Sequence, residues 1–190
     1  IIHTTGLGPH RLNRAIRPSW FFSRKRYGGI LTDIGVHQIV QFLHFTNSKT
    51  ANITMAHVAN HAKPADPELQ DFGEIALRSD HASGYIRVDW YTQDALPNWG
   101  DGRLTLLGTE GYFELIKYVE VGGRDGSDYL IMVNGTRCEK IDAHDAGLPY
   151  FSRLTNDIAH RTETAMRQDH CFEVMELALR AQLLAEEQIL

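Results

Sequence analysis

Seven short runs of alternating residues constrain the fold of this chain more than any other feature. Between residues 51 and 141, polar and apolar side chains alternate with a period of two, and β-branched and aromatic residues are frequent. Both properties are typical of β-strands with one buried face. The runs are ANITMAHVA, FGEIALRS, GYIRVDWY, RLTLLG, GYFELIKYV, YLIMV and TRCEKI.

The segments between the runs predict how the strands pair. Gly-Thr-Glu-Gly at 108–111 and Asn134-Gly135 separate consecutive runs and have the composition of hairpin turns. Strands that follow one another through tight turns pair antiparallel, because parallel neighbours need a long crossover. This region therefore predicts one large antiparallel sheet, with a longer loop at 98–102.

Helices are predicted on both sides of the strand-rich region. Residues 1–5 read as one more strand, and a polar, basic connection follows it. A helix is predicted at about 30–46, and two more at about 150–161 and 169–188. In the last helix four apolar residues recur at helical spacing, which is more typical of a core face than of an interface: Phe172, Met175, Leu179 and Leu183.

These elements predict an α+β fold, in which a few helices pack on a large, mostly antiparallel open β-sheet. The 190 residues are enough for one domain and too few for two, so we expect a single domain over 1–190. Because the chain opens on an apolar strand without an initiator methionine, we also expect it to be a piece of a longer protein.

The charge and composition disfavour several classes of function. A net charge of -5 argues against nucleic acid as the main partner, since phosphate binding needs a basic surface. No uncharged run approaches the ~20 residues of a membrane span, and no signal peptide is visible. Cys138 and Cys171 form no spacing motif, so we expect a reduced, cytoplasmic protein.

Basic residues nevertheless cluster between the first strand and the first helix. The cluster is either a solvated loop face or the rim of a pocket for an anionic ligand. Its members are Arg11, Arg14, Arg17, Arg24, Lys25 and Arg26.

The predicted helix at 30–46 is almost wholly apolar except for one polar seam. At about 100° per residue, this seam consists of Asp33, His37, Gln41 and His44. A carboxylate and an imidazole at i and i+4 can touch, and the carboxylate would then orient the ring and raise its pKa. Such a pair can transfer protons, with His37 as acid or base. The alternative is structural: an aspartate that suits the helix N-terminus and a core histidine with satisfied hydrogen bonds.

Two motifs resemble ligand sites but lack the context that such sites need. GLGPHR at 6–11 begins like a dinucleotide fingerprint, but Arg11 replaces the third glycine and no βαβ unit follows, so we reject it. His57 and His61 are four residues apart, a spacing that brings ligands together on a helix, and this region reads as a strand. We therefore predict no metal site.

The run RPSWFFSRKRYGGILTDIGVHQIVQFL resembles the second domain of the Gfo/Idh/MocA family, the relatives of glucose–fructose oxidoreductase and inositol dehydrogenase. The family carries GG…D-x-G-x-H at the start of a helix in this domain, and here the motif reads Gly28, Gly29, Asp33, Gly35 and His37. LTLLGTEGYFEL resembles a hairpin of the family's open sheet, and LALRAQLLA resembles its C-terminal helix. The resemblance covers essentially the whole chain.

The resemblance implies the substrate-binding and catalytic-histidine domain of an NAD(P)-dependent dehydrogenase, which acts on a secondary alcohol of a sugar or cyclitol derivative. Asp33 and His37 are then the catalytic residues. Family members bind NAD or NADP mainly on an N-terminal Rossmann domain, which this chain lacks, so we expect no cofactor-binding residues here and no activity from this fragment alone. The candidate substrate contacts are His10, Arg11, Asn13, Arg17, Trp20, Tyr27 and Trp99.

A rival interpretation is a non-catalytic oligomerisation or sugar-binding module of the same fold. In either case an open sheet leaves one face that needs cover. We expect this face to pack against a second copy, in a homodimer or homotetramer with closed symmetry. The expected partners are therefore a small polyol or sugar-like molecule and further copies of the chain, with no nucleic acid and no membrane.

Overall fold

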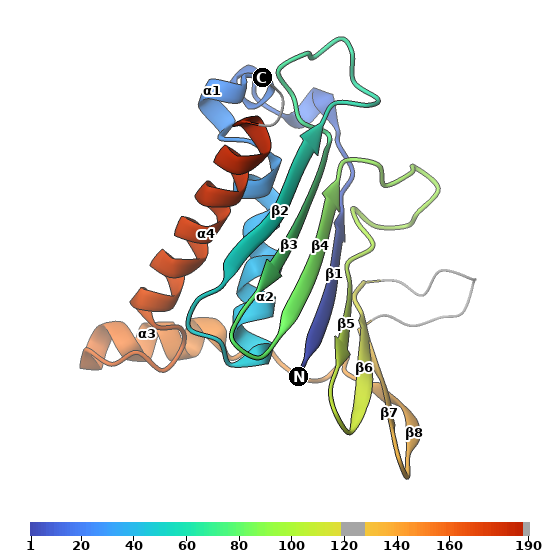
Figure 1. Ribbon diagram of the computed structural model, residues 1–190, viewed down its shortest axis with the longest axis vertical. Helices are drawn as coiled ribbons and strands as arrows, with labels where there is room; N and C mark the ends of the chain where they lie inside the picture. Colours follow the sequence, from blue (N-terminus) through green and yellow to red (C-terminus); the bar gives the residue numbers. More distant parts are fainter. Residues whose placement is uncertain (119–127, 188–190) are drawn as a thin grey trace.

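Eight strands form one sheet in the computed structural model, which describes residues 1–118 and 128–187 (Figure 1). The order across the sheet is β2-β3-β4-β1-β5-β6-β7-β8, so the first strand lies inside the sheet. Neighbouring strands pair antiparallel except β1 and β4, which are parallel. The predicted α+β class with an open, mostly antiparallel sheet is confirmed. The strands are β1 (His3–Pro9), β2 (Asn52–Ala59), β3 (Phe72–Arg78), β4 (Ser83–Asp89), β5 (Arg103–Leu107), β6 (Gly111–Ile116), β7 (Tyr129–Asn134) and β8 (Cys138–Asp142).

The predicted runs and turns agree closely with these strands. Each of the seven runs coincides with one strand to within a few residues at either end, and the two predicted turns join β5 to β6 and β7 to β8. Val119 of one run and Gln188 of the predicted last helix lie outside the described residues. The first strand is longer than the predicted 1–5, because both of its edges are paired, with β4 on one side and β5 on the other.

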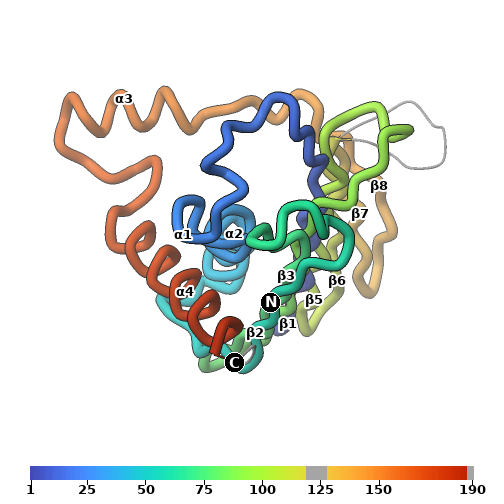
Figure 2. The backbone as a smooth tube through the Cα atoms, turned by 90° about the horizontal axis from the view of Figure 1, so that it is seen from above, coloured from blue at the N-terminus to red at the C-terminus, as the bar shows by residue number. Residues whose placement is uncertain are grey.

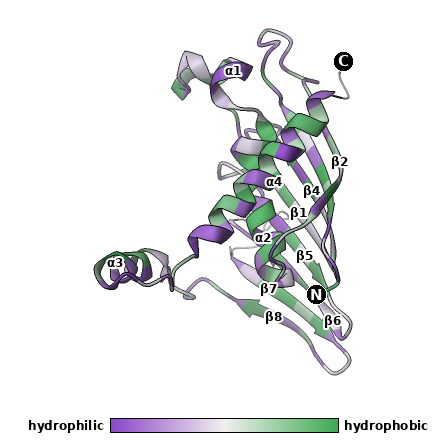
Figure 3. Ribbon diagram, turned by 60° about the vertical axis from the view of Figure 1, so that its left-hand side comes forward, coloured by the Kyte–Doolittle hydropathy of each residue, from purple (hydrophilic) through white to green (hydrophobic). Residues whose placement is uncertain are grey.

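Two long helices cover one face of the sheet, α2 (Val36–Thr46) and α4 (Gln168–Glu187). In Figure 3 apolar residues (green) are concentrated where these helices lie against the strands. The predicted helix at 30–46 begins with a π-helical turn over Leu31–Gly35 and is α-helical only from Val36. Among the core residues between helices and sheet are Ile39, Phe42, Ile75, Ile86 and Leu177.

Short helical turns occupy the basic connection between β1 and α2. They are η1 (Arg14–Ile16), η2 (Ser19–Phe22) and α1 (Arg24–Tyr27). Gly28 and Gly29 follow with φ of 90° and 96°, a conformation that residues with a Cβ rarely adopt. The glycine pair therefore ends α1 and turns the chain into the π-helical turn.

The opposite face of the sheet carries no helix in the described part of the chain (Figure 2). Alternation along β4 turns Ile86 toward the helices and leaves Tyr85 and Arg87 on this open face. Leu107 of β5 and Tyr112 of β6 are paired across their hairpin on the open face, and both are exposed. The open face thus mixes polar side chains with exposed apolar ones.

The prediction of which face of α4 is buried was wrong. The apolar stripe predicted as core is exposed: Phe172, Met175, Leu179 and Leu183. A second stripe of smaller residues is buried in its place, because small side chains let the helix approach the sheet closely. The buried apolar residues are Val174, Leu177, Ala178, Ala181 and Ala185, and Gln182 is buried beside them. The other C-terminal helix, α3 (Tyr150–His160), projects away from the body of the domain (Figure 2).

Candidate functional site

The candidate site lies at the edge of the sheet where the parallel strands β1 and β4 both end, at the top of Figure 1. His10 follows β1 closely and Trp90 follows β4. The backbone N–H of His10 donates to the carbonyl of Asp89 (2.8 Å). The loop between β4 and β5 is fastened to the same edge, because the N–H of Arg11 donates to the carbonyl of Trp99 (2.7 Å).

The start of α2 meets this edge on the helix-covered face. A Cβ added to Gly8 of β1 would lie 2.6 Å from Nε2 of Gln38, and one added to Gly6 would lie 3.2 Å from its Cγ, so α2 lies close against the glycines of this strand. The approach brings Asp33, in the π-helical turn, and His37, in the first turn of α2, toward the end of β1. The charge of His37 accordingly acts on His10 and contributes to lowering its pKa.

Asp33 and His37 are solvent-accessible to different degrees. Asp33 is half-buried and His37 is exposed. Burial raises the pKa of the Asp33 carboxyl above its ordinary value, and the positive charges of Arg17 and His37 oppose this shift. A carboxyl group with a raised pKa beside an exposed imidazole is an arrangement typical of proton-transfer sites.

The direct contact that the i, i+4 spacing predicted is not present. Asp33 and His37 form neither a hydrogen bond nor an ion pair with one another, and they interact only through space. The π-helical turn over Leu31–Gly35 is the physical reason. Its i→i+5 bonding widens the turn, so side chains four residues apart no longer lie directly above one another.

His10 lies at the centre of an aromatic cluster. Its Nδ1–H donates to the carbonyl of Gly8 (2.9 Å), so Nε2 carries the lone pair. Its ring centre lies 5.6 Å from that of Trp90 and 4.5 Å from that of Trp99, which is 49% exposed. Burial lowers the pKa of His10, which favours the neutral ring. Nε2 has no partner in the described part of the chain and can accept a hydrogen bond from a hydroxyl group.

Arg17 reaches over the same cluster from the basic connection. Its guanidinium carbon lies 4.6 Å from the ring centre of Phe21 and 5.1 Å from that of Trp90, within the range of cation–π contacts. Its charge opposes the rise in the pKa of Asp33 and contributes to the lowered pKa of His10. The residues that meet at this edge are His10, Arg17, Asp33, His37, Trp90 and Trp99.

Two of the predicted substrate contacts have structural partners instead. The Nη2 of Arg11 donates to the carbonyls of Gln93 (2.8 Å) and Leu96 (2.6 Å) and so anchors the loop between β4 and β5. The Oδ1 of Asn13 accepts from the N–H of Ala15 (3.0 Å) and caps η1. Both side chains support the loops that surround the site.

Two further predicted contacts lie beside the site. The Tyr27 hydroxyl accepts from the N–H of Gln70 (2.9 Å), and burial raises its pKa to about 12. Trp20 is 44% exposed, with its ring centre 6.2 Å from that of Phe21. Tyr27 therefore belongs to the packing under η2, whereas Trp20 lies on the outer side of that turn.

Trp90 and Phe21 also pack against the site residues, and neither was predicted from the sequence. Trp90 is 4% exposed, and its ring contacts both His10 and Arg17. Its only sequence signal is its place at the end of the GYIRVDWY run. That run lies beside β1 through the one parallel pairing in the sheet, which no local pattern indicates.

The glycines of GLGPHR do not form a cradle for a dinucleotide. Gly6 and Gly8 lie inside β1, and both face Gln38 of α2. Phosphate loops need glycines in a turn whose N–H groups converge on the ligand. Gly6 and Gly8 therefore do not form a phosphate-binding loop.

The described residues also contain no group of three His, Cys, Asp or Glu side chains arranged to hold a metal ion. Nδ1 of His57 lies 3.4 Å from Oε1 of Glu74, and the ring centre of His61 lies 5.7 Å from that of Phe72. Of the helices that the structure describes, none has the length and apolarity needed to cross a membrane.

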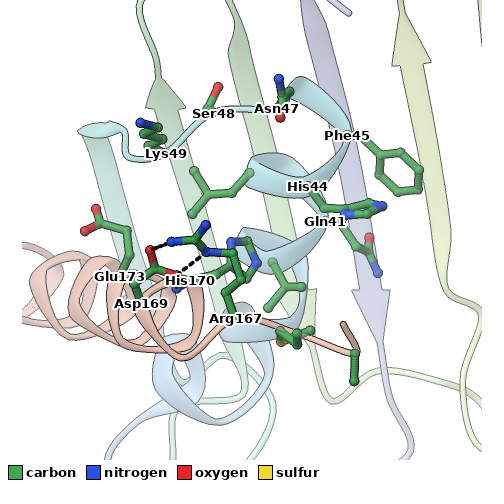
Figure 4. Close-up of a pocket in the computed structure, with 14 residues that line it drawn as sticks. Gln41, His44, Phe45, Asn47, Ser48, Lys49, Arg167, Asp169, His170 and Glu173 are labelled. Atoms are coloured by element: carbon green, nitrogen blue, oxygen red, sulfur yellow. Dashed lines mark hydrogen bonds and ion pairs between the residues drawn. The ribbon is translucent and has the colours of Figure 1, made fainter. Parts of the chain in front are cut away.

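A cavity of about 820 Å³ lies away from this edge, between the second half of α2 and the residues that lead into α4 (Figure 4). Gln41 and His44 of the polar seam line it. On its other side Nε of Arg167 donates to Oδ1 of Asp169 (2.9 Å), so these two charges balance. The polar seam of α2 thus runs from the candidate site into a second concave surface.

The fold and site define a class of protein: an open-sheet α+β domain with an exposed histidine where a helix begins beside the ends of two parallel strands. The sequence model of the GFO/IDH/MocA C-terminal domain matches residues 2–114. The chain is 46% identical to a candidate oxidoreductase from Erwinia carotovora atroseptica, with a TM-score of 0.92 over 97% of this chain and 55% of that one. This chain therefore belongs to the GFO/IDH/MocA family, as a C-terminal domain.

More distant solved structures share the fold. One is the WlbA dehydrogenase from Bordetella pertussis in complex with NADH and UDP-GlcNAcA, with 18% identity and a TM-score of 0.65 over 100% of this chain and 53% of that one. Another is a 3-ketoreductase from Actinomadura kijaniata in complex with NADP and TDP-benzene, with 12% identity and a TM-score of 0.63 over 97% and 53%. The chain thus spans about half the length of these proteins. No curated protein matches it.

Proposed function

We propose that this chain is the substrate-binding and catalytic-histidine domain of an NAD(P)-dependent dehydrogenase, which acts on a secondary alcohol of a sugar or cyclitol derivative. The family membership and the 46% identical candidate oxidoreductase support oxidoreductase chemistry. Distant proteins of the same fold were crystallised with NADH and UDP-GlcNAcA or with NADP and TDP-benzene, which favours sugar-like substrates.

The observation that carries this proposal is the exposure of His37 beside a half-buried carboxylate at the strand edge. In the proposed reaction the His37 imidazole accepts the hydroxyl proton of the substrate as the carbon loses hydride, and it returns the proton in the reverse direction. Asp33 stabilises the resulting imidazolium through space. No side chain needs to attack the substrate covalently.

The nicotinamide is expected to be held by another part of the full-length protein, since the glycines of β1 do not fit its phosphates. When bound there, it would accept or supply the hydride. The residues of this chain would position the alcohol and move its proton. Whether the cofactor is NAD or NADP depends on the other domain, which makes the contacts to the ribose.

His10 and Trp99 are the proposed contacts to the body of the substrate. The free Nε2 of His10 can accept a hydrogen bond from a second hydroxyl group of the sugar. The half-exposed indole of Trp99 offers a flat apolar surface on which a sugar ring can stack. Both side chains are packed together, which limits the entropy lost on binding.

An activity survey of the full-length protein tests the proposal. Reduction of NAD and of NADP would be followed spectroscopically with a panel of cyclitols, aldoses and sugar acids. Turnover of at least one of them, abolished or strongly reduced in His37→Ala, is expected. A protein that binds such compounds but turns over none of them would instead be the non-catalytic sugar-binding module.

We also propose that a second copy covers the open face of the sheet. The exposed pair Leu107 and Tyr112 supports this, because apolar side chains on an uncovered sheet commonly mark an interface.

The unpaired, exposed thiols of Cys138 and Cys171 suit a reducing compartment, and we expect the protein in the cytoplasm.

A further inference from the structure

The basic segment between β1 and α2 uses most of its arginines to hold loops and helices in place. Arg14 forms an ion pair with Asp66, and Arg24 forms one with Glu186. Arg11 is bound to two loop carbonyls, as described above. The guanidinium groups of these three residues therefore already have partners within the fold.

Arg17 is different from these three. Its guanidinium has no hydrogen-bond or ion-pair partner in the part of the chain that the structure describes. It is nevertheless held in a defined place, because it lies over the rings of Phe21 and Trp90, and Trp90 is almost completely buried. Lys25 and Arg26 lie on α1 and are exposed, and no aromatic ring holds them among the described residues.

Arg17 is not paired with Asp33, the acidic residue of the candidate site. The two side chains are near enough to influence one another, but they form no hydrogen bond and no ion pair. A guanidinium has five N–H donors in a planar fork that matches the two oxygens of a carboxylate or a phosphate. The fork of Arg17 is thus fixed on its aromatic support beside the proton-transfer pair, with its donors free.

We propose that Arg17 binds an oxyanion of the substrate, so that the preferred substrates are sugars or polyols that carry a carboxylate or a phosphate. This inference rests on the proposed function, since it concerns the same site. The oxyanion would lie over the Phe21–Trp90 support, and the rest of the molecule would extend past His10 toward Trp99. Arg17 is then a specificity-determining residue, whereas His37 acts on the reacting hydroxyl.

Both binding and turnover are measured with the full-length protein. Binding tests the oxyanion contact of Arg17, and turnover tests the proposed dehydrogenase activity. Calorimetry would measure the affinities of gluconate, glucose 6-phosphate and glucose, and NAD(P) reduction would be assayed with the same three compounds. The wild type is expected to bind at least one charged compound about tenfold or more tightly than glucose. The tighter of the two charged compounds identifies carboxylate or phosphate as the oxyanion.

Arg17→Gln is expected to remove this preference and leave the affinity for glucose unchanged, and Arg17→Lys to restore only part of it. Arg26→Gln removes the same charge from the same segment and should change nothing. The inference is overturned if the wild type shows no preference for charged compounds, or if Arg17→Gln keeps it. Charge preference that depends on Arg17 without any turnover would support the inference and contradict the proposed dehydrogenase.

Discussion

A methyl group on Gly84 would lie 2.7 Å from Cδ2 of Phe42, the ring with which α2 packs against β4. Phe42 is 1% exposed and cannot move aside without disturbing the core. Gly84→Ala is therefore expected to lower the free energy of unfolding by about 1–3 kcal/mol, the usual cost of overpacking. Denaturant unfolding measures this change.

The control for this variant is Gly135→Ala, in the turn between β7 and β8. A Cβ at Gly135 meets nothing within 4 Å, so its effect should lie within about 0.5 kcal/mol of zero. Equal destabilisation by both substitutions would contradict the close contact of α2 with the sheet.

In the full-length protein His37→Ala should lower kcat and kcat/KM together, by roughly the 10²–10⁴-fold of a lost general acid–base. Asp33→Asn should also slow turnover, because the charge that stabilises the imidazolium is removed while the shape is kept. The affinity for NAD(P) should barely change in either variant. His44→Ala, on the same seam but lining the cavity near α4, is the control and should turn over normally. Near-normal turnover by folded His37→Ala protein would exclude the catalytic role.

The pH dependence of the free energy of unfolding should reflect the raised pKa of Asp33. Because burial raises its pKa, the folded protein holds the proton more tightly than the unfolded chain does. The wild type should therefore lose stability relative to Asp33→Asn as the pH rises through the raised pKa of the folded state. Unfolding curves at about pH 3.5, below the ordinary pKa of the carboxyl, and at about pH 7.5 should show a larger advantage for Asp33→Asn at the higher pH. Parallel loss of stability in the two proteins would speak against a destabilised carboxylate.

The chain of residues 1–190 alone should show no dehydrogenase activity and no appreciable affinity for NAD(H). The reason is that Gly6 and Gly8 of GLGPHR, the motif that begins like a dinucleotide fingerprint, lie inside β1 and against α2, where they form no loop for a pyrophosphate. Calorimetric titration of this chain with NADH, beside the full-length protein as the positive control, measures the difference. Micromolar binding to residues 1–190 alone would overturn the prediction.

The full-length protein should sediment as a dimer or tetramer at tens of micromolar concentration, because a second copy is expected to cover the open sheet face. Leu107→Lys puts a charge on that face and should shift the protein toward monomer. Leu148→Lys changes an even more exposed leucine, before α3, and should leave the assembly as it is. A wild type that sediments only as a monomer is the result that would refute the proposed interface.

Local patterns in the sequence were sufficient for most of the secondary structure. Seven alternating runs coincide with β2–β8 to within a few residues, and the turns at 108–111 and at Asn134-Gly135 join hairpins as predicted. The polar seam of the predicted helix at 30–46 was also visible, with Asp33 and His37 on it. These features follow from the geometry of one strand or one helix, and neighbouring residues alone determine them.

Only the tertiary structure decided how the pieces meet. It inserted β1 between β4 and β5, and so brought His10 and Arg17 together with Trp90, because pairing between distant strands depends on contacts that no local pattern carries. It buried the small-residue stripe of α4 and left Leu179 exposed, since a helix with two apolar stripes can turn only one of them to the sheet. It also introduced the π-helical turn over Leu31–Gly35, which packs against α4, β3 and β4, and local spacing in the sequence does not indicate this turn.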